Sequence, residues 1–373
     1  MQAELISVSL GEGALRVSWA DGRVSTYLYL WLRDNCPQLQ HATTKHRVAE
    51  TSEIPDDVRP TRIDVTSDGA VAVTWAHDGH MSTFASAWLR AHDYSNGVRH
   101  ARRLLTLWDS SVAPPNASYP DLVADLGVRL RFLRAFTAYG VGVLHDVPCV
   151  PGTVLEVATL LGEVRTTSWG KVFDVVSMED ANSVAYTNLP LVAHTDEGYR
   201  DPAPTIQLQH FLRADASGGA STLVDGFKVA ADLRAIAPEH FDVLARTILH
   251  FHFSDATADL RASGPVLTLD PEGALTAVRY SNHSVLPFLL PPEQMEAFYA
   301  AYRAFGRMRE SDAYQLRLAL GAGDLYIVDN HRVMHGRTGF SSGGARHLQS
   351  CYIERDELAS RLAVLEREAP LHL

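Results

Sequence analysis

The chain has 373 residues, of which 46% are hydrophobic and 21% charged, a composition typical of soluble domains that excludes disordered and fibrous proteins. Its 33 Lys and Arg residues against 44 Asp and Glu residues give a net charge of −11, which argues against nucleic acid or an anionic membrane as a partner. With no apolar run of about 18 residues and no basic-then-apolar leader, neither a membrane span nor a secretory signal is predicted.

The first ninety residues contain an internal repeat. Residues 6–33 and 63–90 each alternate apolar and polar residues, reach a Trp (Trp19 and Trp75), turn at Asp-Gly and end in Trp-Leu-Arg. Alternation interrupted by Asp-Gly is typical of β-hairpins. Two copies are too few for a solenoid, so we predict a small β domain over residues 1–108.

A second domain is predicted over residues 109–373, after a Pro-rich linker at residues 110–120. Apolar periodicity predicts a helix over residues 121–140. Short strands then dominate, at residues 184–189, 205–211, 221–227, 248–253, 277–281, 324–330 and 347–353, with helices at residues 229–236 and 292–308. Many strands, few helices and no βαβ alternation indicate a mainly β (α+β) domain, a β-sandwich or jelly-roll barrel with outer helices.

Two distant segments carry a candidate metal site. His194 and Asp196 are two residues apart, so on a strand both side chains project to the same face. Far downstream, His335 follows an apolar strand whose end a jelly roll can bring to the same mouth. Most isolated His-x-Asp pairs are surface or turn residues. Two imidazoles and a carboxylate together, however, match the ligand set of non-haem Fe(II) oxygenases.

Arg346 strengthens this interpretation, because it lies on a predicted apolar strand. A guanidinium inside a barrel requires an anion, and its planar shape suits a carboxylate. A ligand with two acidic ends could chelate the metal at one end and pair with Arg346 at the other. 2-Oxoglutarate has that shape, so the sequence predicts an enzyme that uses Fe(II), O₂ and 2-oxoglutarate as its cosubstrate.

At these residues the chain resembles the Fe(II)/2-oxoglutarate oxygenases of the taurine dioxygenase superfamily, and more closely the γ-butyrobetaine and trimethyllysine hydroxylases. The resemblance is carried by the His194-x-Asp196 pair, the HGR of residues 335–337, Arg346, WLRDNCP at residues 31–37, NSVAY at residues 182–186 and GGASTLVDGF at residues 218–227. It implies a double-stranded β-helix, iron ligands at His194, Asp196 and His335, and cosubstrate contacts from Arg346 and from Ser221 or Thr222.

The resemblance also implies hydroxylation of a C–H bond in a small cationic amine or betaine, with release of succinate and CO₂. An aromatic cage that holds a trimethylammonium group by cation–π attraction is expected at Trp169, Phe173, Tyr186 and Tyr352. Two departures favour a changed substrate. Glu197 replaces a Tyr and would favour a cation with N–H donors, and Ser183 replaces an Asn that would hold a substrate carboxylate. Asn282 is expected to supply an amide partner instead.

Two alternatives stay open. The same cofactor chemistry could end in desaturation or C–C cleavage rather than hydroxylation. A non-catalytic jelly-roll protein could also keep the pocket as a ligand sensor, although a sensor need not retain both the metal ligands and Arg346.

The resemblance further implies a homodimer and a structural zinc in the first domain. Here Cys36 is the one cysteine of that region, and Gln38 and Gln40 stand where thiolates would be useful. A Cys-His₃ set would be unusual for structural zinc, so loss of the zinc is favoured; its members would be Cys36, His41, His46 and His80. The chain's three cysteines are odd in number and far apart, which predicts no disulfide framework and a cytoplasmic location.

Overall fold

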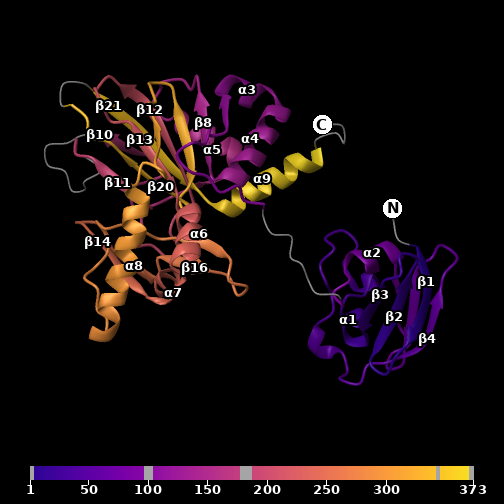
Figure 1. The fold of residues 1–373 in the computed structure, drawn as a ribbon. Helices are drawn as coiled ribbons and strands as arrows, with labels where there is room; N and C mark the ends of the chain where they lie inside the picture. Colours follow the sequence, from indigo (N-terminus) through magenta and orange to yellow (C-terminus); the bar gives the residue numbers. More distant parts are fainter. Residues whose placement is uncertain (1–3, 96–103, 177–186, 342–344, 369–373) are drawn as a thin grey trace. The chain divides into compact units, whose positions relative to one another are not determined.

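The structure, a computed structural model, describes residues 4–95, 104–176, 187–341 and 345–368 (Figure 1). The chain forms two compact units, Met1–Arg102 and Arg103–Leu373. Residue 108 and the predicted linker at residues 110–120 therefore belong to the second unit. The reason is packing, because Trp108 is buried in the second unit's core and donates its indole N–H to the Tyr139 carbonyl over 2.7 Å.

The two halves of the first unit fold alike, as their repeated sequence predicts. Each half is a three-stranded antiparallel sheet followed by a short helix: β1 (Leu5–Leu10), β2 (Ala14–Trp19), β3 (Val24–Leu28) and α1 (Tyr29–Asp34), then β4 (Pro60–Val65), β5 (Val71–Trp75), β6 (Met81–Phe84) and α2 (Ser86–Ala91). Their tryptophans are equivalent, because Trp19 donates its indole N–H to Ser25 and Trp75 donates to Ser82, each over 2.8 Å. Short 3₁₀ turns at Pro37–Leu39 and Thr51–Glu53 lie between the halves.

The two halves also exchange ion pairs. Arg33, at the end of the first half, pairs with Asp78 in the Asp-Gly turn of the second half at 2.7 Å. Arg90, its equivalent in the second half, pairs with Asp21 in the Asp-Gly turn of the first. Side chains from both sheets enter one hydrophobic cluster, so the halves share a single core.

The second unit contains two main sheets. The larger has the order β10-β21-β12-β19-β8-β7, with β9 paired to β21; its strands are β7 (Asn116–Ser118), β8 (Val141–His145), β9 (Val164–Arg165), β10 (Phe173–Val176), β12 (Ile206–Ala214), β19 (Leu325–Asp329) and β21 (Arg346–Ile353). The smaller has the order β11-β20-β13-β18; its strands are β11 (Leu191–His194), β13 (Ser221–Asp225), β18 (Leu316–Leu318) and β20 (Val333–Arg337). Two hairpins complete the unit: β14 (Leu249–Ser254) with β15 (Asp259–Gly264), and β16 (Leu267–Leu269) with β17 (Leu275–Val278).

The second unit is layered, with helices outside both sheets (Figure 1). One hydrophobic cluster joins the inner faces of the sheets, because Leu223 and Val333 of the smaller sheet pack with Phe211 and Tyr326 of the larger. A second cluster lies between the larger sheet and α3 (Tyr119–Ala124), α4 (Leu126–Tyr139), α5 (Thr153–Leu161) and α9 (Arg355–Glu368). A third lies between the smaller sheet and α6 (Gly226–Ile236), α7 (Pro238–Arg246) and α8 (Pro292–Glu310). The predicted sheet-dominated domain with outer helices is thus confirmed.

Local chemistry explains where the prediction and the structure differ. The single helix predicted over residues 121–140 is two helices, because the Asp125 carboxylate accepts the N–H groups of Gly127 and Val128 and so caps α4. Gly140, with φ of 72°, ends α4 in the left-handed conformation. The described part of the strand predicted at residues 184–189 is a bend. Within the described chain, no helix combines the length and apolarity that crossing a bilayer requires.

A buried ion pair fixes the start of β20 against the end of β13. Arg332 donates from Nε to Asp225 Oδ1 over 3.0 Å and from Nη2 to Oδ2 over 2.8 Å, and the two side chains are 1% and 0% exposed. Arg332 also donates to the carbonyl of Ala138 at the end of α4, and Asp225 accepts the backbone N–H of Trp108. The pair therefore ties the smaller sheet to the end of α4 and to the first segment of the unit.

We expect Asp225→Ala to lower the free energy of unfolding by about 3–5 kcal/mol, because it leaves the Arg332 charge buried without a partner. Urea unfolding followed by circular dichroism measures the loss. Asp312→Ala is the matched control, since its pair with Arg317 is exposed (85% and 57%) and its loss should cost about 0–1 kcal/mol. Equal losses in the two variants would contradict a structural role for the buried pair.

Candidate active site

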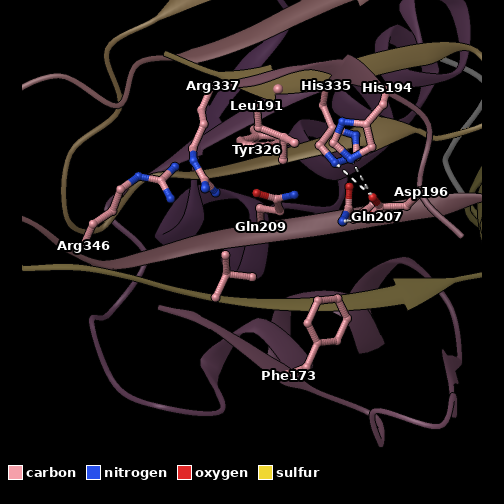
Figure 2. Close-up of a pocket in the computed structure, with 12 residues that line it drawn as sticks. Phe173, Leu191, His194, Asp196, Gln207, Gln209, Tyr326, His335, Arg337 and Arg346 are labelled. Carbon is pink, nitrogen blue, oxygen red and sulfur yellow. Dashed lines mark hydrogen bonds and ion pairs between the residues drawn. The ribbon is translucent and has the colours of Figure 1, made fainter. Parts of the chain in front are cut away.

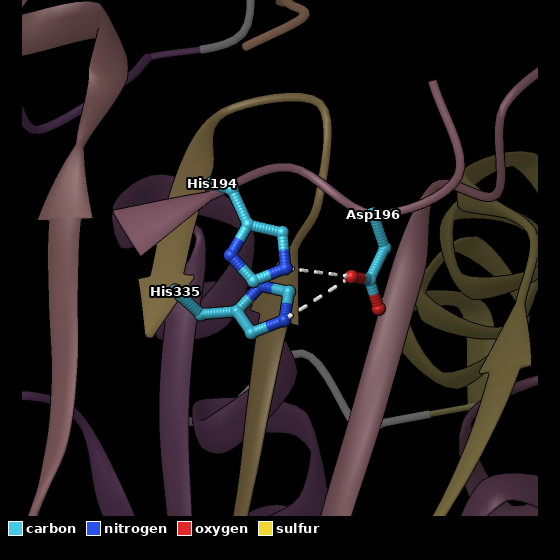
Figure 3. A group of neighbouring side chains, drawn as sticks. All are labelled: His194, Asp196 and His335. Carbon is cyan, nitrogen blue, oxygen red and sulfur yellow. Dashed lines mark hydrogen bonds and ion pairs between the residues drawn. The ribbon is translucent and has the colours of Figure 1, made fainter. Parts of the chain in front are cut away.

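The three predicted metal ligands meet beside the smaller sheet. His194 ends β11 and lies opposite His335 in the antiparallel register of β11 with β20. The Nε2 atoms of His194 and His335 lie 3.2 and 3.5 Å from Oδ1 of Asp196 (Figure 3). One ligand atom from each residue lies within 4.8 Å of the other two. This set of two imidazole nitrogens and one carboxylate oxygen fits Fe(II) bound on one face.

Neighbouring groups orient two of these ligands. His194 Nδ1 lies 3.0 Å from the Val192 carbonyl; with the proton on Nδ1, the Nε2 lone pair faces the shared point. Oδ2 of Asp196 accepts hydrogen bonds from the Tyr352 hydroxyl at 2.7 Å and from Gln207 Nε2 at 2.5 Å. Oδ1 therefore remains the oxygen directed at the metal.

Asn330 holds the backbone of Asp196. Its Oδ1 accepts the Asp196 N–H over 2.7 Å, and its Nδ2 donates to the carbonyls of Asp196 and Pro204 over 3.1 and 2.8 Å. Asn330 is 1% exposed and follows the last residue of β19. Asp196 lies outside a strand, and its backbone is held by Asn330 at the end of a strand of the larger sheet.

The site favours the ligand forms of its residues. Burial lowers the pKa of His335 to about 4, so its imidazole is neutral at pH 7 and can donate a lone pair. Burial alone would raise the pKa of Asp196, but the adjacent imidazoles and the Tyr352 hydroxyl outweigh it and hold that pKa below the usual value. A neutral imidazole beside an ionised carboxylate is the state that binds a divalent metal.

A pocket extends from the triad toward two arginines (Figure 2). Arg337 and Arg346 lie at one end, the triad lies at the other, and Gln209 and Tyr326 line the space between them. Burial, and to a smaller extent the charge of Arg346, lower the pKa of Arg337 to about 10, so the Arg337 guanidinium is still charged at pH 7.

Arg346 forms no ion pair within the described part of the chain, and its guanidinium stacks 5.4 Å from the rings of Phe211 and Phe340. A buried guanidinium without an ion-pair partner among the described side chains suits a carboxylate ligand, so Arg346 makes this end of the pocket a site for one.

The register separates Ser221 from Thr222. Ser221 lies opposite Arg337 in the pairing of β13 with β20, so it shares the inner face of the smaller sheet with that arginine. Thr222 lies opposite Gly336 and faces the other way. Of the two residues left open by the sequence, Ser221 is on the side of the pocket.

The predicted substrate residues occupy several places. Phe173 lines the pocket, with its ring 5.5 Å from that of Tyr352, the residue that also donates to Asp196. Asn282 lines a neighbouring cavity that also reaches His194, and its Oδ1 accepts the Tyr302 hydroxyl over 2.6 Å. Ser183 and Tyr186 lie outside the described residues.

Glu197 differs from its expected role as a charge beside the substrate. Its side chain is 5% exposed and forms an ion pair with Arg200. Its Oε1 accepts the indole N–H of Trp169 over 2.9 Å. Burial raises the pKa of Glu197, and the Arg200 charge opposes that shift.

Sequence patterns did not single out Gln207, Gln209 or Asn330, nor the position of Arg337 in the pocket. The alternation of residues 206–209 could have indicated the two glutamines. Ile206 and Leu208 face the helical layer, whereas Gln207 and Gln209 face the pocket. A polar inner face on a central strand indicates a site rather than a core. Asn330 had no such signal, since its role depends on a contact with a residue far along the chain.

The candidate zinc residues of the first unit are not gathered around one point. Cys36 Sγ lies 3.2 Å from His80 Nε2, and Gln38 Oε1 accepts the Thr83 N–H over 3.0 Å. Of the residues that the structure describes, His194, Asp196 and His335 are the one group of three or more ligand side chains within reach of a shared ion. His41 and His46 therefore do not join Cys36 and His80.

The chain is similar to two protein-family models and to several known dioxygenases. The model of the "Taurine catabolism dioxygenase TauD, TfdA family" matches residues 102–352, and the model of the γ-butyrobetaine hydroxylase-like N-terminal domain matches residues 6–90. The γ-butyrobetaine dioxygenase of Pseudomonas sp. (strain AK-1) is 37% identical over 97% of this chain and 96% of its own. The trimethyllysine dioxygenase of Meyerozyma guilliermondii is 29% identical over 98% of this chain and 96% of its own. A solved asparagine oxygenase with Fe(II), 3-hydroxyasparagine and succinate has a TM-score of 0.49 and 19% identity, and the match covers 64% of this chain and 93% of that one.

We expect Tyr352→Phe and Gln207→Leu each to weaken Fe(II) binding about 10- to 100-fold, because each removes a donor that orients Asp196. Anaerobic titration without cosubstrate measures the affinity. Gln209→Leu is the control, since Gln209 lines the same pocket from the same strand but bonds to none of the three ligands. An unchanged Fe(II) affinity in both test variants would show that the hydrogen bonds to Asp196 Oδ2 do not contribute to metal binding.

Proposed function

The chain belongs to the taurine catabolism dioxygenase (TauD, TfdA) family of iron- and 2-oxoglutarate-dependent dioxygenases, and we propose that it hydroxylates a small substrate carrying a trimethylammonium group. One observation carries the assignment of the cofactors to residues. A single pocket has the His194, Asp196 and His335 triad at one end and Arg346 at the other. A dicarboxylate such as 2-oxoglutarate matches this arrangement, because its two acidic ends meet a metal and a guanidinium.

When bound, iron with 2-oxoglutarate and O₂ supplies the oxidising chemistry that turns a C–H bond into an alcohol and releases succinate and CO₂. His194, Asp196 and His335 would hold the iron, and Arg346 would hold the distal carboxylate of the cosubstrate, with Ser221 on the same inner face. Phe173 and Tyr326 add aromatic surface to a pocket wall that also presents Gln207 and Gln209.

The substrate proposal rests on the named activities of the relatives and on the aromatic residues near the triad. The two relatives above are dioxygenases of γ-butyrobetaine and trimethyllysine, both of which carry a trimethylammonium group. Tyr352, Phe173 and Trp169 would offer their faces to that cation. Asn282 would donate from Nδ2 to the substrate carboxylate, because the Tyr302 hydroxyl already occupies its Oδ1.

The test compares coupled succinate release with γ-butyrobetaine, trimethyllysine and a neutral isostere in which a tert-butyl group replaces trimethylammonium. We expect kcat/KM for the better cation to exceed that of its isostere by about tenfold or more, because a neutral group loses the cation–π attraction. His194→Ala should abolish turnover and serves as the control. Equal turnover of the isostere would contradict the proposed substrate class.

Arg346→Gln should raise KM for 2-oxoglutarate about 10- to 100-fold, since it removes a charge-assisted contact with the carboxylate. Steady-state succinate release at varied cosubstrate measures the change. Arg213→Gln is the charge-matched control, because Arg213 is 63% exposed and pairs with Asp215. An unchanged KM in the Arg346 variant would place the distal carboxylate elsewhere.

We also propose that the protein is a cytoplasmic homodimer. The family resemblance supports the dimer, and the free thiols of Cys36, Cys149 and Cys351 suit a reducing compartment. Sedimentation analysis of the purified chain tests the dimer.

A further inference from the structure

The turn that follows the metal ligand Asp196 is unusually constrained. Glu197 has φ of 51°, a left-handed conformation that few residues other than Gly adopt. The Arg200 N–H donates to the Glu197 carbonyl over 2.9 Å and closes the turn. This conformation directs the Glu197 side chain into a buried position, where the residue is 7% exposed.

Both ends of the buried Glu197 carboxylate have partners. Oε1 accepts the indole N–H of Trp169 over 2.9 Å, and Oε2 pairs with Nε of Arg200. Arg200 in turn donates from Nη2 to the hydroxyl of Ser168 over 2.6 Å. The turn that follows Asp196 therefore holds two adjacent residues, Trp169 through Glu197 and Ser168 through Arg200.

Aromatic rings complete the support of Trp169. Its ring meets Phe253 edge-on with centroids 5.2 Å apart, and Phe253 stacks at 5.1 Å on Tyr199 of the same turn. The indole is thus fixed through its N–H on one side and through a ring on another. We call Glu197 and Arg200 the clamp.

The clamp also changes the charge that a bound cation meets. Arg200 is 13% exposed and Glu197 5% exposed, so the two opposite charges neutralise each other out of contact with bulk water. A free carboxylate would favour an ammonium that has N–H donors, whereas a quaternary ammonium has none. An aromatic face attracts both kinds through the ring quadrupole.

We propose that the clamp positions Trp169 and neutralises the charge beside the substrate, so that the site prefers a fully N-methylated ammonium to one that carries N–H. This inference rests on the proposed function, in which Trp169 forms one wall of the cation site. It assigns to Glu197 and Arg200 the roles of positioning and specificity residues.

The specificity test uses paired substrates that differ by one methyl group, trimethylammonium and dimethylammonium. Arg200→Gln exposes the Glu197 charge, so the ratio of kcat/KM for the dimethyl over the trimethyl compound should rise about tenfold. Glu197→Gln keeps an acceptor for Trp169 but leaves the Arg200 charge without its partner, so kcat/KM should fall for both cations and their ratio should not rise. Arg246→Gln, on the exposed face of α7, is the control for loss of an arginine.

The positioning test compares Glu197→Ala with Glu197→Gln. Glu197→Ala should raise KM for both cations about tenfold and leave KM for 2-oxoglutarate unchanged. Glu197→Gln leaves the same unpaired Arg200 charge but keeps an acceptor for Trp169, so it should raise KM for both cations less than Glu197→Ala does. The indole N–H resonance of Trp169, assigned with Trp169→Phe, gives a readout that needs no activity. It should shift in Glu197→Ala and return toward its original position in Glu197→Gln. Each variant is compared at equal iron content.

The outcomes separate the two proposals. If the wild-type protein fails to couple succinate release to any trimethylammonium compound, the proposed function falls, while the resonance of Trp169 still decides whether the clamp positions that ring. If the wild type is active but Arg200→Gln leaves the substrate ratio unchanged, the specificity role is wrong. An unmoved Trp169 resonance in Glu197→Ala overturns the clamp itself.

Discussion

The antiparallel pairing of β11 with β20 is the constraint on which the site depends. It places His194 directly opposite His335, and Asp196 needs only a short turn to reach the same point. Cross-strand neighbours are separated by backbone hydrogen bonds rather than by flexible side chains, so the distance between the imidazoles is set by the sheet. The buried Arg332–Asp225 pair then fixes the first residue of β20 against β13. The relative positions of the two histidine ligands are therefore set by the register of β11 with β20.

Charge is distributed unevenly along the pocket that starts at this pairing. The triad presents one carboxylate and two imidazole rings, and the far end presents two guanidinium groups. Oδ2 of Asp196 and both carboxylate oxygens of Glu197 have a nearby donor or cation, and Oδ1 of Asp196 is left for the metal. Positive charge at Arg346 is not compensated by an ion pair among the described side chains, and this asymmetry supports the proposed orientation of a dicarboxylate.

The sequence predicted those parts of the molecule that depend on local patterns. The repeat of the first unit, most of the strands predicted for the second and the His-x-Asp pair follow from alternation or spacing within a few residues. Contacts between distant segments escaped it. Trp108 joined the second unit because of Asp225 and Tyr139, and Asn330 holds Asp196 from the other sheet. Glu197 was expected to act as a free charge, and only the fold shows that Arg200 neutralises it.

The exchanged ion pairs of the first unit have a consequence for how that unit is built. Arg33 pairs with Asp78 and Arg90 pairs with Asp21, so each half contributes one arginine and one aspartate to two equivalent ion pairs. A reciprocal contact of this kind is the isologous interface of a two-fold symmetric assembly. The unit thus has the architecture of two similar subunits joined in one polypeptide, and a single half expressed alone would expose the side of its sheet that the other half now covers.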